Sequence, residues 1–368
     1  MHAQAFKVGM QAPDDVSRAA ELLDRGAFRA DHVVAILGKT EGNGAVNDYT
    51  RALATLSFQM LLAKRGGRSI EDIARRVPII WSGGTEGLMS PHATIFTREP
   101  DRGKPTGQKR FATGTAYTRD LLPEEFGTAV HAQVAAEGVR AAIKDAGIES
   151  AEDLHFIQIK TGALTTERIA QARSRGRTVV TTDTYKSMAY ARAVAALGIG
   201  VATGEIAASK VADEIIGRDF SIASNVASTS SGVELMNCEI IVLGNSASST
   251  SDLVIAHAVM RDAIDAGAVR EALRRAGLTV DCELAERDRE RLVNVFAKCE
   301  PDPSGATRGR RHVMFEDGDI NYTRHIRGVV NAVIAAVTGD TRCYVSAGAE
   351  HQGPPGGGVV AVLARISA

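Results

Sequence analysis

The sequence offers little that would support a metal cluster, a disulfide framework or a membrane segment. Its four cysteines show neither CxxC spacing nor a Cys/His metal pattern. We expect all four to be reduced packing residues: Cys238, Cys282, Cys299 and Cys343. No apolar run approaches the roughly 18 residues that cross a bilayer, and the first residues show no apolar signal-peptide core. These absences predict a cytoplasmic protein with no membrane partner.

An excess of charge of one sign is also missing. The formal net charge is −1, with acidic and basic residues spread along the chain. No global field would attract nucleic acid, so we expect no nucleic-acid partner. A length of 368 residues with 44% apolar composition allows two to three conventional domains or one large repetitive body.

What the chain does contain is one order of residues, repeated three times. In each third a lysine leaves an apolar strand, an arginine opens an apolar helical pattern, and a serine follows in a small-residue turn. The sets are Lys39, Arg51 and Ser82, then Lys160, Arg192 and Ser230, then Lys298, Arg327 and Ser346. One such set would be ordinary in any α/β protein. Three ordered sets predict three copies of one unit around a shared centre, which would hold a small, acidic, roughly three-fold ligand.

The order strand, helix, strand within each unit favours an α/β fold. We expect units at residues 1–104, 111–249 and 254–368, with a charged linker over 97–110. The first unit should contain helices over 16–25 and 50–65 and strands over 33–37 and 78–81. The second should contain strands over 111–119, 153–160 and 220–232 and helices over 125–146 and 187–202. The strand 239–247 leads into the third, with helices over 254–267 and 321–337 and strands over 291–298, 342–348 and 357–366.

The third arginine has two candidates. Arg324 in NYTRHI resembles Arg51 in NDYTRA. We prefer Arg327, because RGVVNAVIAAVTG aligns with RAVAALGIGVATG around Arg192.

A lysine beside a serine indicates nucleophilic catalysis. A serine hydroxyl needs a base, and a lysine can serve if burial or a nearby cation keeps it neutral. Glu41 and Glu300 lie two residues after Lys39 and Lys298, whereas no carboxylate follows Lys160 until Glu167. This spacing favours Lys160 as the neutral base and Ser230 as its nucleophile. The adjacent Ser231 could add a hydroxyl, and the small-residue turns could offer N–H groups to carbonyl oxygens.

The C-terminal segment SAGAEHQGPPGGG is rich in glycine and proline. The sequence alone favours a tight structural loop; the alternative is a site for a hard cation such as Mg²⁺ or Ca²⁺, which its carbonyls together with Glu300 would suit. GKT at 38–40 lacks the first glycine of a phosphate loop, so we expect no organic cofactor.

Five motifs resemble those of the cyanuric acid hydrolases and their relatives, the barbiturases: GKTEGNGAVNDYTR, WSGGTEG, SRGRTVVTTDTY, NVFAK and GAEHQGPPGGG. The resemblance covers essentially the whole chain. It implies three repeats about a pseudo-three-fold axis with the ring-shaped substrate at the centre, and also a homotetramer.

Carried over by motif, the resemblance gives Ser230 as nucleophile and Lys160 as its base, with Lys39 and Lys298 in the other two dyads. The implied substrate contacts are Arg51, Ser82, Gly83, Arg192, Ser231, Arg327, Ser346 and Ala347. The implied metal site comprises Glu300 with carbonyls of Ala349, Gln352, Gly353, Pro354 and Gly357. Ala347 stands where the family has glycine. This difference concerns only the backbone geometry with which that position would bind a substrate oxygen.

The implied reaction is hydrolytic opening of the cyanuric acid ring to carboxybiuret, which decarboxylates to biuret. Two other functions stay open at this point. One is a barbiturase that opens barbituric acid. The other is a non-catalytic binding protein for small cyclic anions, which would use the same arginines without an activated serine.

Overall fold

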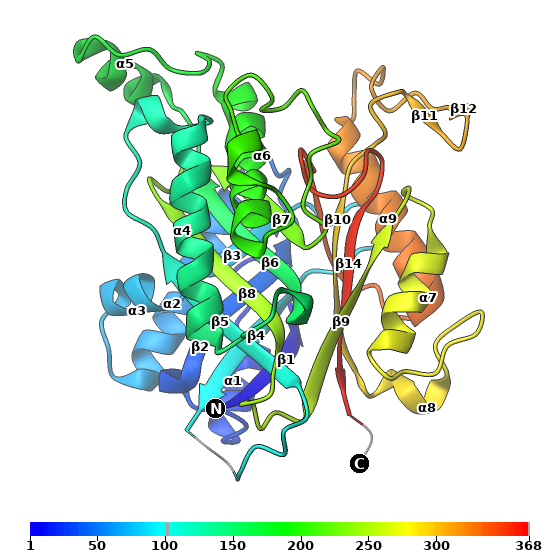
Figure 1. Cartoon of the computed structure of the whole chain (residues 1–368). Helices are drawn as coiled ribbons and strands as arrows, with labels where there is room; N and C mark the ends of the chain where they lie inside the picture. The colour runs from blue at the N-terminus through cyan, green and yellow to red at the C-terminus, as the bar shows by residue number, and fades with distance from the viewer. Residues whose placement is uncertain (101–102, 367–368) are drawn as a thin grey trace.

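Three four-stranded sheets organise the chain (Figure 1). The structure, a computed structural model, describes residues 1–100 and 103–366. The sheets have the strand orders β1-β4-β2-β3, β5-β8-β6-β7 and β9-β14-β10-β13, so each repeats the same pattern. In each, the third strand of this order carries the lysine and pairs in parallel with the edge strand that carries the serine. The expected α/β fold of three repeats is confirmed.

The first repeat places two helices after the lysine strand. Its strands are β1 (His2–Gly9), β2 (Val33–Thr40), β3 (Ile79–Gly83) and β4 (His92–Glu99). Its helices are α1 (Ser17–Asp24), α2 (Tyr49–Gly66) and α3 (Ile70–Arg76). The Asp48 side chain caps α2 by accepting from Thr50 N, and Gly67 ends it in the left-handed region that glycine adopts without strain.

In the second repeat two long helices, α4 (Ala129–Ala146) and α6 (Thr184–Thr203), lie side by side on the outer face of the sheet (Figure 1). Its strands are β5 (Arg110–Tyr117), β6 (Leu154–Gly162), β7 (Ala227–Gly232) and β8 (Cys238–Ser246). Its helices are α4 (Ala129–Ala146), α5 (Thr166–Ser174) and α6 (Thr184–Thr203).

The third repeat has strands β9 (Leu253–Met260), β10 (Leu292–Cys299), β13 (Tyr344–Ala347) and β14 (Gly358–Arg365). Its helices are α7 (Ala266–Arg275), α8 (Glu286–Arg289) and α9 (Tyr322–Thr338), and a small hairpin joins β11 (Ala306–Thr307) to β12 (Arg310–Arg311). Asn321 caps α9 by accepting from Thr323 N.

The inner faces of the three sheets share one apolar core, while the helices lie outside (Figure 1). Each repeat contributes an aromatic ring to this core, and the Phe96, Phe156 and Phe296 rings form a chain of contacts. Separate clusters fill the space between each sheet and its own helices. Both faces of each sheet are covered by apolar side chains. Polar groups of the three repeats therefore come together at the ends of the strands.

Two expectations about elements were wrong. The segment 254–267 is not a helix throughout, because residues 253–260 form β9 and pair with β14 over eight residues. Its apolar run is buried between a helix layer and the central core, where strand and helix patterns look alike. The strand near 239–247, β8, lies between β5 and β6, so it belongs to the second sheet and does not open the third unit.

The linker expected over 97–110 is shorter than predicted, because β4 continues to Glu99 and β5 starts at Arg110. Residues 101 and 102 lie outside the described part. No helix in the described residues is long and apolar enough to cross a membrane.

Gly114 in β5 tests how closely α4 packs on its sheet. A Cβ there would lie 2.2 Å from Ala142 O and 2.4 Å from Ala146 N, both backbone atoms of α4. We expect Gly114→Ala to destabilise the fold by about 2 kcal/mol, because the helix must shift away. Gly318→Ala is the control, since no atom of the part of the chain that the structure describes lies within 4 Å of a Cβ at that position. Thermal unfolding should show a clear loss for the first variant only; equal transitions would contradict this packing.

Candidate active site

Strand register brings each lysine opposite its serine. Lys39 pairs with Ser82, Lys160 with Ser230 and Lys298 with Ser346 in the parallel strands. Paired residues on neighbouring strands point to the same face, so each pair can meet at the central edge. All three lysines are almost fully buried.

The three arginines reach the same centre from the helices α2, α6 and α9. Arg51 lies three residues after the cap of its helix, Arg327 six and Arg192 nine. From Arg51 to Arg327 to Arg192, the helix thus begins about one more turn before the arginine in each case.

One central cavity collects these side chains. Its lining comprises Gly44, Arg51, Trp81, Ser82, Gly83, Met188, Arg192, Ser230, Ser231, Arg327, Ser346 and Ala347. It thus brings together every substrate contact that the family motifs imply, and the serine assigned as nucleophile. The lysines stand behind the serines and do not line this cavity.

The two candidates for the third arginine differ in burial. The side chain of Arg327 is 5% exposed and lines the cavity, whereas that of Arg324 is 43% exposed and does not. The similarity of NDYTR to NYTRH reflects a shared helix start, because Asp48 and Asn321 are both N-caps.

A fourth repeated residue was missed in the sequence. Glu86, Glu234 and Glu350 each lie four residues after the serine of their own repeat. Each forms an ion pair with the arginine of another repeat: Glu86 with Arg327, Glu234 with Arg51 and Glu350 with Arg192. The pairs run in one direction around the axis and link all three repeats. The recurring sequence pattern SxxxE, a serine with a glutamate four residues later, could have revealed them.

Two of the lysines contact their serines directly. Lys39 Nζ lies 2.9 Å from Ser82 Oγ, and Lys298 Nζ lies 3.1 Å from Ser346 Oγ. Burial lowers the pKa of Lys39 well below its usual value, and nearby Arg327 adds to the shift. Burial, with Arg192, lowers the pKa of Lys298 to about 7. A desolvated ammonium is unfavourable, so both lysines approach the neutral form that a base requires.

Lys160 has a different partner. Its Nζ lies 3.0 Å from Glu234 Oε1, so the expectation that Lys160 lacks a nearby carboxylate was wrong. The carboxylate comes from the turn after β7, which is far from Lys160 in the sequence, so the spacing of residues along the chain did not reveal it. Glu41, by contrast, is exposed and has no contact with Lys39. Burial still lowers the pKa of Lys160, and Glu234 opposes that shift.

Ser230 accepts a hydrogen bond from an amide that sequence reasoning also missed. Gln158 Nε2 lies 3.3 Å from Ser230 Oγ, and its Oε1 accepts from Ser228 Oγ at 2.7 Å and Tyr344 Oη at 3.1 Å. Leu37 and Phe296 occupy the corresponding positions of the other repeats, two residues before the lysine. A polar residue there is therefore specific to the second repeat.

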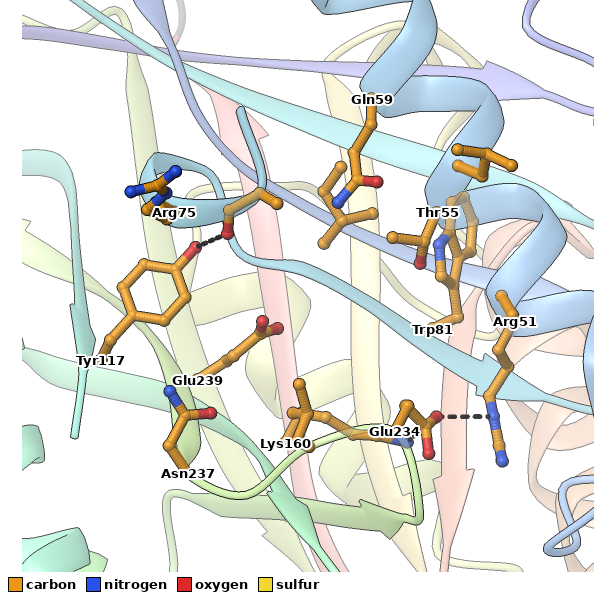
Figure 2. A pocket seen from close by; sticks show the side chains of 15 residues that line it. Arg51, Thr55, Gln59, Arg75, Trp81, Tyr117, Lys160, Glu234, Asn237 and Glu239 are labelled. Carbon is orange, nitrogen blue, oxygen red and sulfur yellow. Dashed lines mark hydrogen bonds and ion pairs between the residues drawn. The ribbon is translucent and has the colours of Figure 1, made fainter. Parts of the chain in front are cut away.

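A larger pocket, of about 690 Å³, opens on the other side of Lys160, between the first and second repeats (Figure 2). Its polar lining includes Arg51, Lys160, Glu234 and Glu239. Glu239 is the cross-strand neighbour of Lys160 in β8, and burial raises the pKa of Glu239 to about 8. Arg51 and Trp81 line both cavities, so these two side chains form part of the wall between them.

The C-terminal turn can be tested against the implied cation. Glu300, Ala349, Gly353 and Pro354 line a cavity of about 170 Å³, whereas Gln352 and Gly357 do not. Glu300 is buried, accepts from Ala349 N at 2.8 Å, and has its pKa raised to about 7 by burial and Glu350. The described residues contain no cluster of three or more His, Cys, Asp or Glu side chains that could hold a metal. One carboxylate with several carbonyls is a donor set that fits Mg²⁺ or Ca²⁺.

The comparisons with known proteins agree with this site. A family model for ring-opening amidohydrolases matches residues 4–365. The chain therefore belongs to this family of hydrolases, which act on cyclic amides.

Among its relatives, a cyanuric acid amidohydrolase of Enterobacter cloacae is 51% identical over 370 residues, covering 100% of both chains. Barbiturase 2 of a Nocardioides strain is 45% identical and covers 98% of both. A solved cyanuric acid hydrolase, described as an evolutionary innovation by structural concatenation, matches with a TM-score of 0.94 at 46% identity, covering 99% of each chain.

Gln158 provides a test of the polar network under Ser230. Gln158→Leu would leave the Ser228 and Tyr344 hydroxyls without their acceptor in a buried place. We expect a loss of about 2 kcal/mol in the free energy of unfolding. Gln133→Leu, at an exposed position of α4, is the control and should change stability by less than about 0.5 kcal/mol. Denaturant unfolding measures both; an unchanged Gln158→Leu protein would refute the network.

Proposed function

We propose that the protein opens the ring of cyanuric acid by hydrolysis. The observation that carries the proposal is the single cavity to which three repeats each contribute a serine and an arginine. Cyanuric acid has three equivalent carbonyl groups, so a three-fold set of donors matches its shape. Guanidinium groups and serine hydroxyls can bind its oxygens as the ring becomes anionic. The names of the cyanuric acid amidohydrolases at about half identity support this substrate.

In the proposed mechanism Ser230 is the nucleophile and Lys160 the general base. Lys160 takes the Ser230 proton as Oγ attacks one ring carbonyl. The adjacent C–N bond then breaks, and Lys160 returns the proton to the leaving nitrogen. Water attacks the resulting acyl-enzyme, with Lys160 again as base, and releases carboxybiuret and free Ser230. Carboxybiuret then loses carbon dioxide to give biuret.

The other two serines would bind the oxygens that do not react. Ser82 and Ser346 line the same cavity, and their lysines stand behind them. The choice of Ser230 rests on the family motifs. It is also supported by the larger pocket, which reaches Lys160 and gives its proton a way to solvent; neither Lys39 nor Lys298 is among the residues that line it.

Barbituric acid is the second candidate substrate, because a relative named Barbiturase 2 is 45% identical over the full length. Purified protein incubated with each compound separately, with products identified by mass, decides between them. Loss of cyanuric acid with formation of biuret supports the main proposal. Consumption of barbituric acid alone would keep the mechanism and replace the substrate. Binding of cyanuric acid without turnover would favour the non-catalytic alternative.

Serine and lysine variants test the mechanism. Ser230→Ala and Lys160→Ala should each lower kcat by about a thousandfold or more, because the nucleophile or its base is lost. Binding should survive, since the arginines remain. Ser82→Ala and Ser346→Ala are the matched controls and should retain the acylation step in single-turnover kinetics. Loss of acylation in all three serine variants would contradict a unique nucleophile.

We also propose that Glu300 and the carbonyls of Ala349, Gln352, Gly353, Pro354 and Gly357 hold a structural Mg²⁺ or Ca²⁺. The cation would neutralise the buried Glu300 carboxylate and fix the turn that follows Ser346 and strand β13.

A homotetramer is likewise proposed, on the family resemblance and on an exposed apolar stripe. Tyr49, Leu53, Leu56 and Met60 lie at helical spacing on α2 and are all at least 45% exposed. Such a stripe favours association with another subunit. Light scattering of the purified protein gives the mass directly.

A further inference from the structure

The second repeat departs from the geometry that the other two share. Arg327 donates two hydrogen bonds to Glu86, from Nε at 2.8 Å and Nη2 at 2.5 Å. Arg192 does the same with Glu350, at 2.9 and 2.5 Å. In both pairs the two carboxylate oxygens of the glutamate accept hydrogen bonds from the guanidinium. These two pairs give an internal reference for the third.

Arg51 and Glu234 do not adopt this arrangement. Arg51 Nε lies 3.3 Å from Glu234 Oε1 without forming a hydrogen bond, and this buried Nε has no other partner among the described residues. Glu234 instead contacts Lys160 at 3.0 Å. Figure 2 shows its carboxylate between the lysine and the arginine. A buried donor without an acceptor is costly, so Arg51 Nε is a place where Glu234 can bind more strongly.

The same difference appears in the lysines. Lys39 and Lys298 contact their serines, and their glutamates are occupied by arginines. Lys160 contacts Glu234, and no hydrogen bond joins it to Ser230. In the second repeat, therefore, the glutamate contacts the lysine and makes no hydrogen bond to the arginine, and the lysine makes no hydrogen bond to its serine.

Glu234 also has room to move. Its side chain is 37% exposed to the larger pocket, against 13% for Glu86 and 16% for Glu350. A turn of its carboxylate toward Arg51 would give the two-bond geometry of the other repeats.

We infer that Glu234 is a positioning residue that exchanges between Lys160 and Arg51, and that its move to Arg51 delivers Lys160 to Ser230. The inference rests on the proposed function of the Lys160–Ser230 pair. While Glu234 holds Lys160, the lysine is an ammonium and is kept from the serine. After the exchange Lys160 releases one proton to solvent through the larger pocket and becomes the base. A ligand on Arg51 in the central cavity would favour this state, because it binds the guanidinium that Glu234 then orients.

Charged and titratable groups from several elements face Glu234 and Lys160 across the larger pocket. They are Arg51 from α2, Arg75 from α3, Tyr117 from β5 and Glu239 from β8, with Arg168 of α5 also acting on Glu234. Burial opposes ionisation of Glu234, yet Lys160 and Arg51 lower its pKa to about 2, so it is a carboxylate across the working pH range.

The sign of the pH effect follows from this charge. Glu234 raises the pKa of Lys160 relative to burial alone. The acid limb of kcat/KM reports loss of the neutral base as the pH falls. Removing the Glu234 charge should therefore lower the pKa of Lys160 and move the acid limb to lower pH.

The test compares Glu234→Gln with Glu86→Gln. Both substitutions weaken the hold on a substrate arginine, so both should raise KM by about tenfold. Only Glu234→Gln should also move the acid limb of kcat/KM, by about one pH unit or more toward acid. An unmoved limb in Glu234→Gln, or an equal shift in Glu86→Gln, would overturn the inference.

Arg51→Lys gives a second variant with the opposite expectation. It keeps the positive charge but not the two-donor fork, so Glu234 should stay with Lys160 and the limb should move to higher pH. A shift toward acid in this variant would also overturn the inference. Failure of the proposed function is distinguishable, because it would appear as full turnover in Lys160→Ala, whatever the profile of the Glu234 variant.

Discussion

The ring of arginine–glutamate pairs is the interaction on which the site depends. Each glutamate follows the serine of its own repeat and binds the arginine of another, so three pairs close a circuit around the axis. Buried ion pairs cost desolvation and are weak evidence for net stability. Their effect here is on placement: the two fully hydrogen-bonded pairs fix Arg192 and Arg327 at the cavity wall, and all three pairs tie one repeat's helix to another repeat's serine turn.

Three-fold construction explains the shape of the cavity, and its imperfections explain how one repeat can act differently from the others. Gln158 stands where the other repeats have Leu37 and Phe296. Glu239 faces Lys160 across the strand, whereas His92 faces Lys39. These substitutions surround one lysine with polar groups and an open pocket. A symmetric scaffold thereby binds a symmetric ligand while a single repeat carries the proposed chemistry.

Much of this was predictable because the signals were local. Repeated lysines, arginines and serines revealed the three units, and helix periodicity placed α2, α6 and α9 within a few residues. Local signals failed for β9, whose apolar run lies between two buried layers. They also failed for the carboxylate beside Lys160, because Glu234 arrives from a separate turn that only β6–β7 pairing brings close. The partner of each repeated glutamate lies in another repeat, so its role emerges only from packing.

The most direct test of the account is to quench the enzyme during turnover of cyanuric acid and locate the acyl group by peptide mass. The account predicts an adduct on the peptide containing Ser230, carrying the added mass of one intact substrate ring-opened on the serine. An adduct on Ser82 or Ser346 instead would contradict the assignment of the reacting repeat.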